Sequence, residues 1–261
     1  MLQDLANGIA AIGGWFADPA NWSGNDGIPN RMVEHLVLCL LSMVAALLVA
    51  LPIGLYIGHT GRFSFISVQL ANIGRAVPSY AVMALLFPLS IAFSRAGASG
   101  GLAYFATFAA MVLLAVPPVV TTTYAGMNGV DGDLREAALG MGMRGGQMLR
   151  QVELPLALPV VLTGVRIAAV QVIATATLGA VFGGGGLGRY IIQGFARRDY
   201  TRLWSGVLMV AIMAIGTELL FAWLVRRSNR RTTGNIVIAS DLDRPQPTID
   251  KPPGRPHGRT P

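Results

Sequence analysis

Two ionisable residues, Arg166 and Glu218, interrupt long apolar stretches of this 261-residue sequence. If residues 159–181 and 203–225 each cross a membrane, both charges lie about 10 to 12 Å in from the same side, at ~1.5 Å per residue. A lone charge at that depth costs about 2.5 to 3.5 kcal/mol, so Arg166 snorkels to the interface, lines a cavity or pairs with a carboxylate. Glu218 cannot snorkel far, which favours an ion pair that would lock the two segments together.

Four polar side chains in the same kind of surroundings are candidates for a translocation pathway. They occur in "AVPSYAVM" and "VQVIATATL" and are Ser79, Gln171, Thr175 and Thr177. Polar groups in apolar helices are costly unless they line a cavity or find partners. Gln171 is the strongest candidate, whereas the threonines are explained equally well by hydrogen bonds between helices or to their own backbone.

Other reactive patterns do not form sites. His35, His59 and His257 lack the spacing of metal ligands, and no Ser, His and Asp or Cys and His set shares a depth. "GGGGLG" at 183–188 matches G-x-G-x-x-G, but it follows an apolar segment rather than a strand. Its glycines are predicted to let the backbone turn and pack closely. We therefore expect no catalytic residue, no metal and no cofactor.

The composition predicts the elements that carry these residues. The chain is 53% hydrophobic and only 13% charged, against about 25% charged in soluble domains. Apolar segments that meet or approach the length of about 20 residues needed to span a bilayer lie at 36–58, 76–93, within 102–130, 159–181 and 203–225. Pro117 and Pro118 should kink or end the third. The fold class is thus an all-α integral membrane protein with about five transmembrane helices.

Charge suggests the domain boundaries and the orientation. Residues 1–32 form a retained extracytoplasmic segment, 33–225 the transmembrane domain, and 226–261, rich in Arg and Pro, a disordered tail. Arg226, Arg227, Arg230 and Arg231 beside the last segment indicate a cytoplasmic C-terminus, which puts the N-terminus outside. Four arginines then fall on the outer side against the rule: Arg189, Arg197, Arg198 and Arg202. The net charge of +7 reflects topology and tail rather than nucleic-acid binding.

Residues 131–159 form a long charged segment inside this apolar chain. Asp131 or Asp133 can cap a helix, Glu136 suits its first turn, and the prolines of "ELPLALP" should end the pattern. Two short helices are expected. One face is apolar, formed by Leu134, Ala137, Ala138 and Met141. Periodicity alone leaves open whether that face rests on lipid headgroups or on a partner protein.

The spacing within 131–159 resembles the EAA motif of ABC importer permeases, with valine where isoleucine is commonest. The matching residues are Glu136, Ala137, Ala138, Gly142, Val152, Leu154 and Pro155. The resemblance implies the type I ABC importer permease core, in which this cytoplasmic insertion forms coupling helices that dock on an ABC ATPase dimer.

The wider sequence resembles the subgroup of these permeases that imports glycine betaine, choline, carnitine and related osmoprotectants. The likeness covers nearly all of residues 20–225 and includes "NWSGNDGIPNRMVEHL" and "NIGRAVPSYAVMALLFPL". It implies a multi-pass subunit of the cytoplasmic (inner) membrane that hydrolyses nothing itself. Its implied partners are the lipid bilayer, the ATPases, a second identical or related permease copy, and a separate substrate-binding protein or lipoprotein.

Three alternatives remain. An ABC importer permease for an amino acid such as methionine would share the five-span core. A stand-alone secondary transporter would require internal repeats, which the sequence does not display. A receptor or scaffold would explain the spans but leave the EAA pattern without a reason.

Overall fold

The computed structural model describes residues 2–62, 65, 69, 73–74, 77–95 and 104–242, and this part of the chain is helical. Four helices within it are long and apolar enough to cross a membrane: Ile28–Thr60, Phe105–Asn128, Gly145–Phe182 and Tyr200–Asn229. They correspond to α2 (Ile28–Thr60), α5 (Phe105–Asn128), α8 (Leu154–Gly179) with its flanking turns, and α10 (Tyr200–Leu242). A shorter helix, α4 (Ser79–Arg95), packs against α5.

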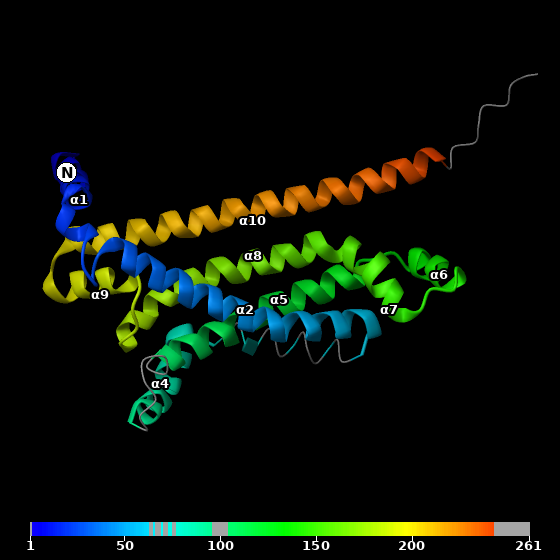
Figure 1. Ribbon diagram of the computed structural model, residues 1–261, viewed down its shortest axis with the longest axis horizontal. Helices are drawn as coiled ribbons and strands as arrows, with labels where there is room; N and C mark the ends of the chain where they lie inside the picture. The colour runs from blue at the N-terminus through cyan, green and yellow to red at the C-terminus, as the bar shows by residue number, and fades with distance from the viewer. Residues whose placement is uncertain are drawn as a thin grey trace, which may run out of the picture.

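The long helices lie lengthwise, with α2 against α5, α5 against α8, and α8 against α10 (Figure 1). Small residues at the contacts permit this close approach. Ala46, Ala50, Ala115 and Ala168 are fully buried in the main core. A Cβ added at Gly54 would come within 2.7 Å of the Thr123 side chain, so this contact between α2 and α5 requires glycine.

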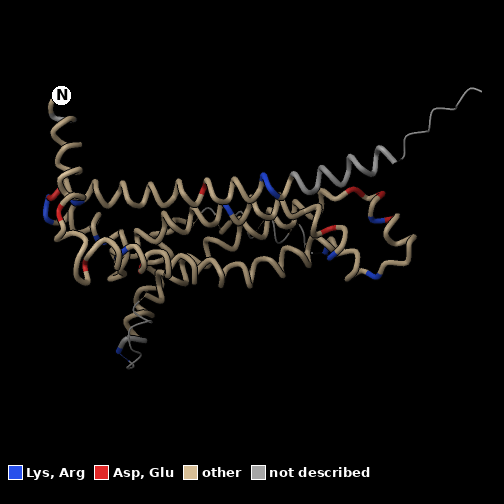
Figure 2. Tube along the Cα trace, turned by 45° about the horizontal axis from the view of Figure 1, so that its top comes forward, with Lys and Arg blue, Asp and Glu red and all other residues tan. Residues whose placement is uncertain are grey.

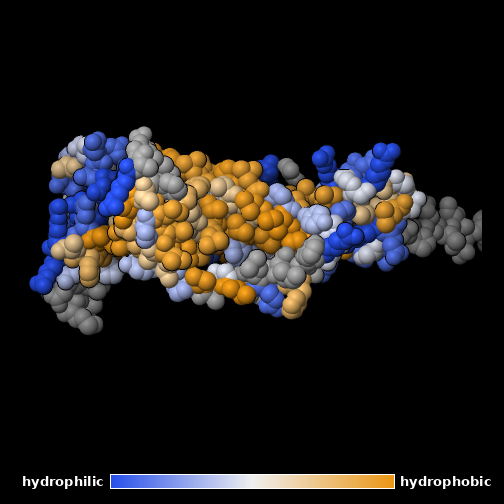
Figure 3. Space-filling model, turned by 90° about the horizontal axis from the view of Figure 1, so that it is seen from below, coloured by the Kyte–Doolittle hydropathy of each residue, from blue (hydrophilic) through white to orange (hydrophobic). Residues whose placement is uncertain are grey.

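Most of the charged residues gather at the two ends of the bundle (Figure 2), where the shorter elements lie (Figure 1). One end carries α1 (Leu2–Ala17), a 3-10 turn (Pro19–Trp22) and α9 (Gly188–Arg197), which a second 3-10 turn (Ala180–Phe182) precedes. The other end carries α6 (Gly132–Gly140) and α7 (Gly145–Met148). Between them the surface is a broad apolar band with hydrophilic ends (Figure 3), as expected of a membrane-spanning bundle.

Several helix ends differ from the sequence-based expectation. The helix α2 begins at Ile28 rather than near residue 36, and α5 continues through Pro117 and Pro118. The prolines of "ELPLALP" do not end the helical pattern, because a π turn (Leu149–Glu153) leads directly into α8. Pro155 lies in the first turn of α8, where its missing N–H would have had no helical partner.

The predicted disordered tail at 226–261 is wrong for its first part. The helix α10 continues to Leu242, because no proline interrupts the chain between Tyr200 and Pro245. Residues 243–261 lie outside the described part of the chain.

Candidate coupling loop and translocation groove

The segment 131–159 contains the two expected short helices. The Asp131 carboxylate caps α6 by accepting a hydrogen bond of 3.0 Å from the Asp133 backbone N–H. At the turn into α7, the Gln147 side chain accepts a bond of 2.9 Å from the Arg144 backbone N–H. Gly142 lies between the helices with φ +82°, a left-handed conformation that favours glycine.

The motif residues are mostly on the surface of this loop. Ala138 is buried, Glu136, Ala137, Gly142 and Pro155 are exposed, and Val152 and Leu154 are half-buried. Among the described residues, no heavy atom lies within 4 Å of the place that a Cβ would take at Gly142. The backbone conformation, rather than close packing within the chain, therefore explains this glycine.

The tip of the loop exposes large apolar side chains. Leu134, Leu139 and Met141 are exposed, with Met141 at 72%. Of the apolar face expected from the sequence, Ala138 is the member that packs inward. An exposed apolar patch on a projecting element is typical of a protein interaction site.

A buried carboxylate that the sequence analysis overlooked holds the base of the loop. The Glu153 side chain is 1% exposed, and its Oε2 lies 2.6 Å from His59 Nδ1. Its Oε1 lies 3.1 Å from Arg135 Nε. Arg135 also donates a hydrogen bond of 2.5 Å from Nη2 to the Met127 carbonyl. We call His59, Arg135 and Glu153 the anchor cluster.

The anchor cluster joins elements that are distant in sequence. It connects the end of α2, the end of α5, the helix α6 and the π turn before α8. The sequence held one signal for it, because Glu153 interrupts the apolar pattern "VELPLALP" and a buried carboxylate requires partners. Nothing in the sequence identified His59, which lies 94 residues away.

The two intramembrane charges meet. Arg166 Nη2 on α8 forms an ion pair with Glu218 Oε1 on α10. The two side chains are 32% and 40% exposed. They lie in a groove of about 520 Å³ lined by Thr163, Arg166, Ile167, Val170, Gln171, Ala174 and Glu218. We call it the α8–α10 groove.

The other predicted pathway residues lie in different surroundings. Gln171 lines the α8–α10 groove next to the ion pair. Thr175 is buried in the bundle, and Thr177 donates a hydrogen bond of 2.7 Å to the Ala174 carbonyl. Ser79 is half-buried at the start of α4. Gln171 thus lines the same groove as the ion pair. Thr177 instead bonds to its own helix backbone, which was the alternative explanation for the threonines.

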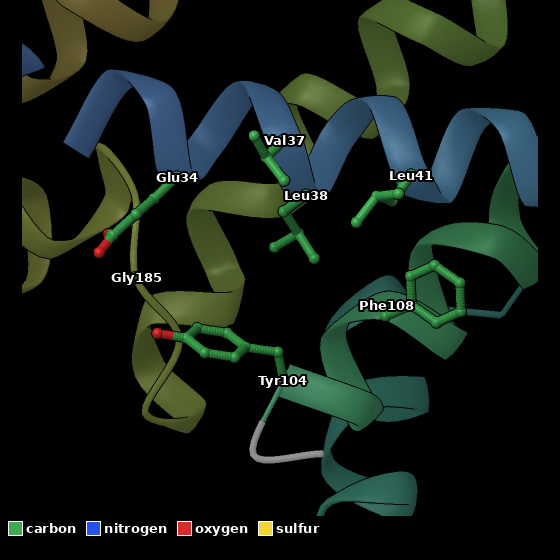
Figure 4. Close-up of a pocket in the computed structure, with 7 residues that line it drawn as sticks. All are labelled: Glu34, Val37, Leu38, Leu41, Tyr104, Phe108 and Gly185. Atoms are coloured by element: carbon green, nitrogen blue, oxygen red, sulfur yellow. The ribbon is translucent and has the colours of Figure 1, made fainter. Parts of the chain in front are cut away.

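The glycine-rich segment 183–188 packs against the start of α2. The Gly186 N–H donates a hydrogen bond of 2.8 Å to Glu34 Oε2, and Gly186 has φ +75°. Gly185 faces the Glu34 carboxylate so closely that a Cβ would collide with it. Figure 4 shows the pocket of about 300 Å³ beneath this contact, which Tyr104 and Phe108 also line. The prediction of close glycine packing is confirmed.

Carboxylates at the α1 end of the bundle lie near Arg31 and near two of the arginines that conflicted with the charge rule, Arg189 and Arg202. Arg31 pairs with Asp26, and its Nη1 donates to Glu34 Oε2 at 2.6 Å. The hydrogen bond from Arg31 holds the pKa of Asp26 below its usual value, and the nearby charges of Arg189 and Arg202 act in the same direction. The positive charge at this end is therefore partly balanced locally.

Comparison with known proteins now identifies the architecture. Residues 50–234 match the family described as the binding-protein-dependent transport system inner membrane component. This chain belongs to that family. As an inner membrane component it is a multi-pass permease subunit and not an enzyme, and it works with an ATPase and a substrate-binding protein.

Individual relatives of this permease subunit cover most of its length. It is 33% identical to the carnitine transport permease protein OpuCD of Listeria monocytogenes over 75% of this chain and 84% of that protein. It is 31% identical to the glycine betaine/carnitine/choline transport system permease protein OpuCB of Bacillus subtilis over 74% and 85%. A solved inward-facing structure of the MetNI methionine ABC transporter has the same fold, with TM-score 0.65 and 21% identity over 77% and 95%.

Proposed function

We propose that this permease subunit provides the membrane pathway of an ATP-driven importer of osmoprotectants: glycine betaine, choline, carnitine and similar quaternary ammonium solutes. The observation that carries the proposal is identity above 30% with permeases named for these solutes, over about three quarters of the chain. The likeness to MetNI, at 21% identity, is a likeness of fold. It gives no comparable support to methionine import.

The partners follow from the loop at 131–159. We propose that α6 and α7 dock on a cytoplasmic ABC ATPase dimer through the exposed tip formed by Leu134, Leu139 and Met141. Closure of the ATPases would move α6, and the anchor cluster would transmit the movement to α2 and α8. A second permease copy, identical or related, and a separate receptor protein would complete the importer.

The topology proposed here has five crossings. The fifth would be α4, whose 17 residues would extend about 25 Å at ~1.5 Å per residue, close to the lower limit for a span. In Figure 1 this helix lies at a steep angle to the four long helices, so it would cross the membrane strongly tilted. The N-terminus with residues 1–32 would lie outside, and α6, α7 and the C-terminal segment in the cytoplasm. Residues 243–261 would form a disordered tail, given their richness in Arg and Pro.

The Arg166–Glu218 pair would lock α8 to α10 while no solute separates the two side chains. The coupling loop immediately precedes α8, so movement delivered by the loop would pass to both helices as a unit instead of being absorbed between them.

Reconstitution tests the proposed function. The permease is assembled in proteoliposomes with its ATPase and receptor, and uptake of labelled glycine betaine, choline, carnitine and methionine is measured. We expect ATP-dependent uptake of at least one quaternary ammonium solute. Uptake of methionine alone would assign the chain to the rival importer, and uptake without the ATPase would make it a secondary transporter.

A further inference from the structure

The α8–α10 groove places two opposite charges on a face of the bundle where contact with lipid would carry a desolvation cost. Arg166 and Glu218 keep 32% and 40% of their side chains exposed, although both helices are otherwise apolar. Charged groups within a membrane face a water-filled cavity or other protein. The groove therefore opens toward a polar space, such as the pathway between two permease copies.

The chemistry of the groove complements a zwitterion. The planar Arg166 guanidinium can bind a carboxylate through two parallel N–H groups, and Glu218 can attract a quaternary ammonium group. The Gln171 amide lies beside the pair and offers both donors and an acceptor. The volume of about 520 Å³ is in the range of small-molecule sites, about 300 to 1,000 Å³.

Partial exposure makes exchange of partners feasible. Separating a buried ion pair leaves uncompensated charge, but a half-exposed pair is solvated as it opens. A solute that carries both charges can replace each partner with an equivalent one, so no charge stays unpaired during the exchange.

We propose that the α8–α10 groove is a transient binding site for zwitterionic solutes that carry a carboxylate and a quaternary ammonium group. The solute carboxylate takes the place of Glu218 on Arg166, and its cationic group is held by Glu218. The identity of the solute rests on the proposed function. Choline, which has no carboxylate, occupies Glu218 without engaging Arg166.

Cysteine protection tests the site directly. Gln171→Cys is introduced in a Cys39→Ala background, which removes the single natural cysteine of the chain. The full complex is then labelled with an uncharged polar thiol reagent, with and without ATP. Glycine betaine at about ten times its dissociation constant should slow labelling by about tenfold, because only about one site in ten is then free, and an uncharged solute such as sucrose should not. Ser23→Cys, exposed at the end of the first 3-10 turn, is the control and should be unaffected.

An apolar replacement of the pair separates binding from structure. Arg166→Met combined with Glu218→Leu removes both charges and keeps similar bulk. If the pair has only a structural role, this replacement should change stability little. In the Gln171→Cys background this double variant should label normally but lose protection by glycine betaine. Unchanged protection, or none in the parent, overturns the site.

The outcomes for the site and for the proposed function are distinct. Protection is measured on the permease complex whether or not net uptake occurs. An importer that takes up betaines without any protection at position 171 keeps the proposed function and rejects the groove. Protection by glycine betaine without uptake supports the groove and rejects the proposed transport.

Discussion

The anchor cluster and the Arg166–Glu218 pair use the same chemistry at two depths of burial. Glu153 is 1% exposed, with His59 and Arg135 on either side, whereas Glu218 is 40% exposed and has one cationic partner. Loss of a partner from a buried pair costs about 3 to 5 kcal/mol, but exposed pairs contribute about 0 to 1 kcal/mol. The difference in burial therefore predicts that the anchor cluster is a permanent joint, whereas the Arg166–Glu218 pair is a contact that can exchange partners.

The position of each pair agrees with this difference. The anchor cluster lies where the loop at 131–159 meets the ends of α2 and α5, and the Arg166–Glu218 pair joins α8 to α10 within their apolar stretches. In the proposed mechanism the anchor cluster has to stay closed to transmit movement from an ATPase, whereas the Arg166–Glu218 contact has to open when a solute binds. Substitutions at the two places should therefore differ in size and in kind.

Glu153→Gln should have the largest effect. It keeps the shape of the side chain but leaves the Arg135 charge without its carboxylate, at a cost of about 3 kcal/mol or more. We expect a clearly lower thermal midpoint of the solubilised complex and loss of ATP-driven uptake. Glu136→Gln, exposed in the same loop, is the matched control for stability. An unchanged midpoint for Glu153→Gln would contradict the expectation that the buried anchor cluster contributes more to stability than the Arg166–Glu218 pair.

The Arg166 and Glu218 substitutions should have intermediate effects. Arg166→Ala and Glu218→Ala should each lower stability or uptake, and the double variant should recover part of the loss, with a coupling energy of about 1 kcal/mol. The charge-swapped variant should also recover part. A double-mutant cycle on thermal midpoint and uptake gives the value. Strictly additive losses would show that the contact contributes nothing.

Gly142→Ala should strain the turn between α6 and α7 by about 1 to 2 kcal/mol, because alanine is disfavoured at φ +82°. Uptake should fall while the ATPase stays bound, and Gly142→Trp should uncouple the complex fully. Gly142→Asn, which tolerates the left-handed conformation, should be milder than Gly142→Ala. Gly140→Ala is the control, since that glycine is helical and its surroundings among the described residues are open. Normal uptake by Gly142→Trp would exclude the coupling role.

Asp26→Asn should have the smallest effect, because this partner of Arg31 is 67% exposed. The folded pKa of Asp26 is below its ordinary value of 3.8. Its contribution is therefore present above that value and is lost as the pH falls through the folded pKa. At neutral pH we expect the free energy of unfolding to fall by at most about 1 kcal/mol relative to wild type, seen as a slightly lower thermal midpoint. At a pH well below the folded pKa the two midpoints should be the same. A loss as large as that of Glu153→Gln would contradict the ranking by burial.

Local properties determined much of this protein from sequence alone. Hydropathy over 20 or so residues identifies spans, turn residues and caps identify the two helices at 131–159, and the spacing from Glu136 to Pro155 carries the resemblance to importer permeases. The Arg166–Glu218 contact was also predictable, because charges at matching depth in a membrane have few alternatives to pairing. The helix ends were harder to predict from the sequence. The expected span ended at residue 225, but α10 continues to Leu242 without any local stop signal.

Tertiary structure alone decided the rest. Glu153 meets His59 across 94 residues, and Gly186 meets Glu34 across 152. No local pattern identifies the partner in either contact, because each partner is set by how α2 packs against the segments that flank α8. Packing also set the exposure of each carboxylate, which makes Glu153 a fixed joint and leaves Glu218 beside Gln171 in an open groove. Sequence specifies which groups carry charge, but the surrounding helices determine their solvation, and solvation sets what separating a pair costs.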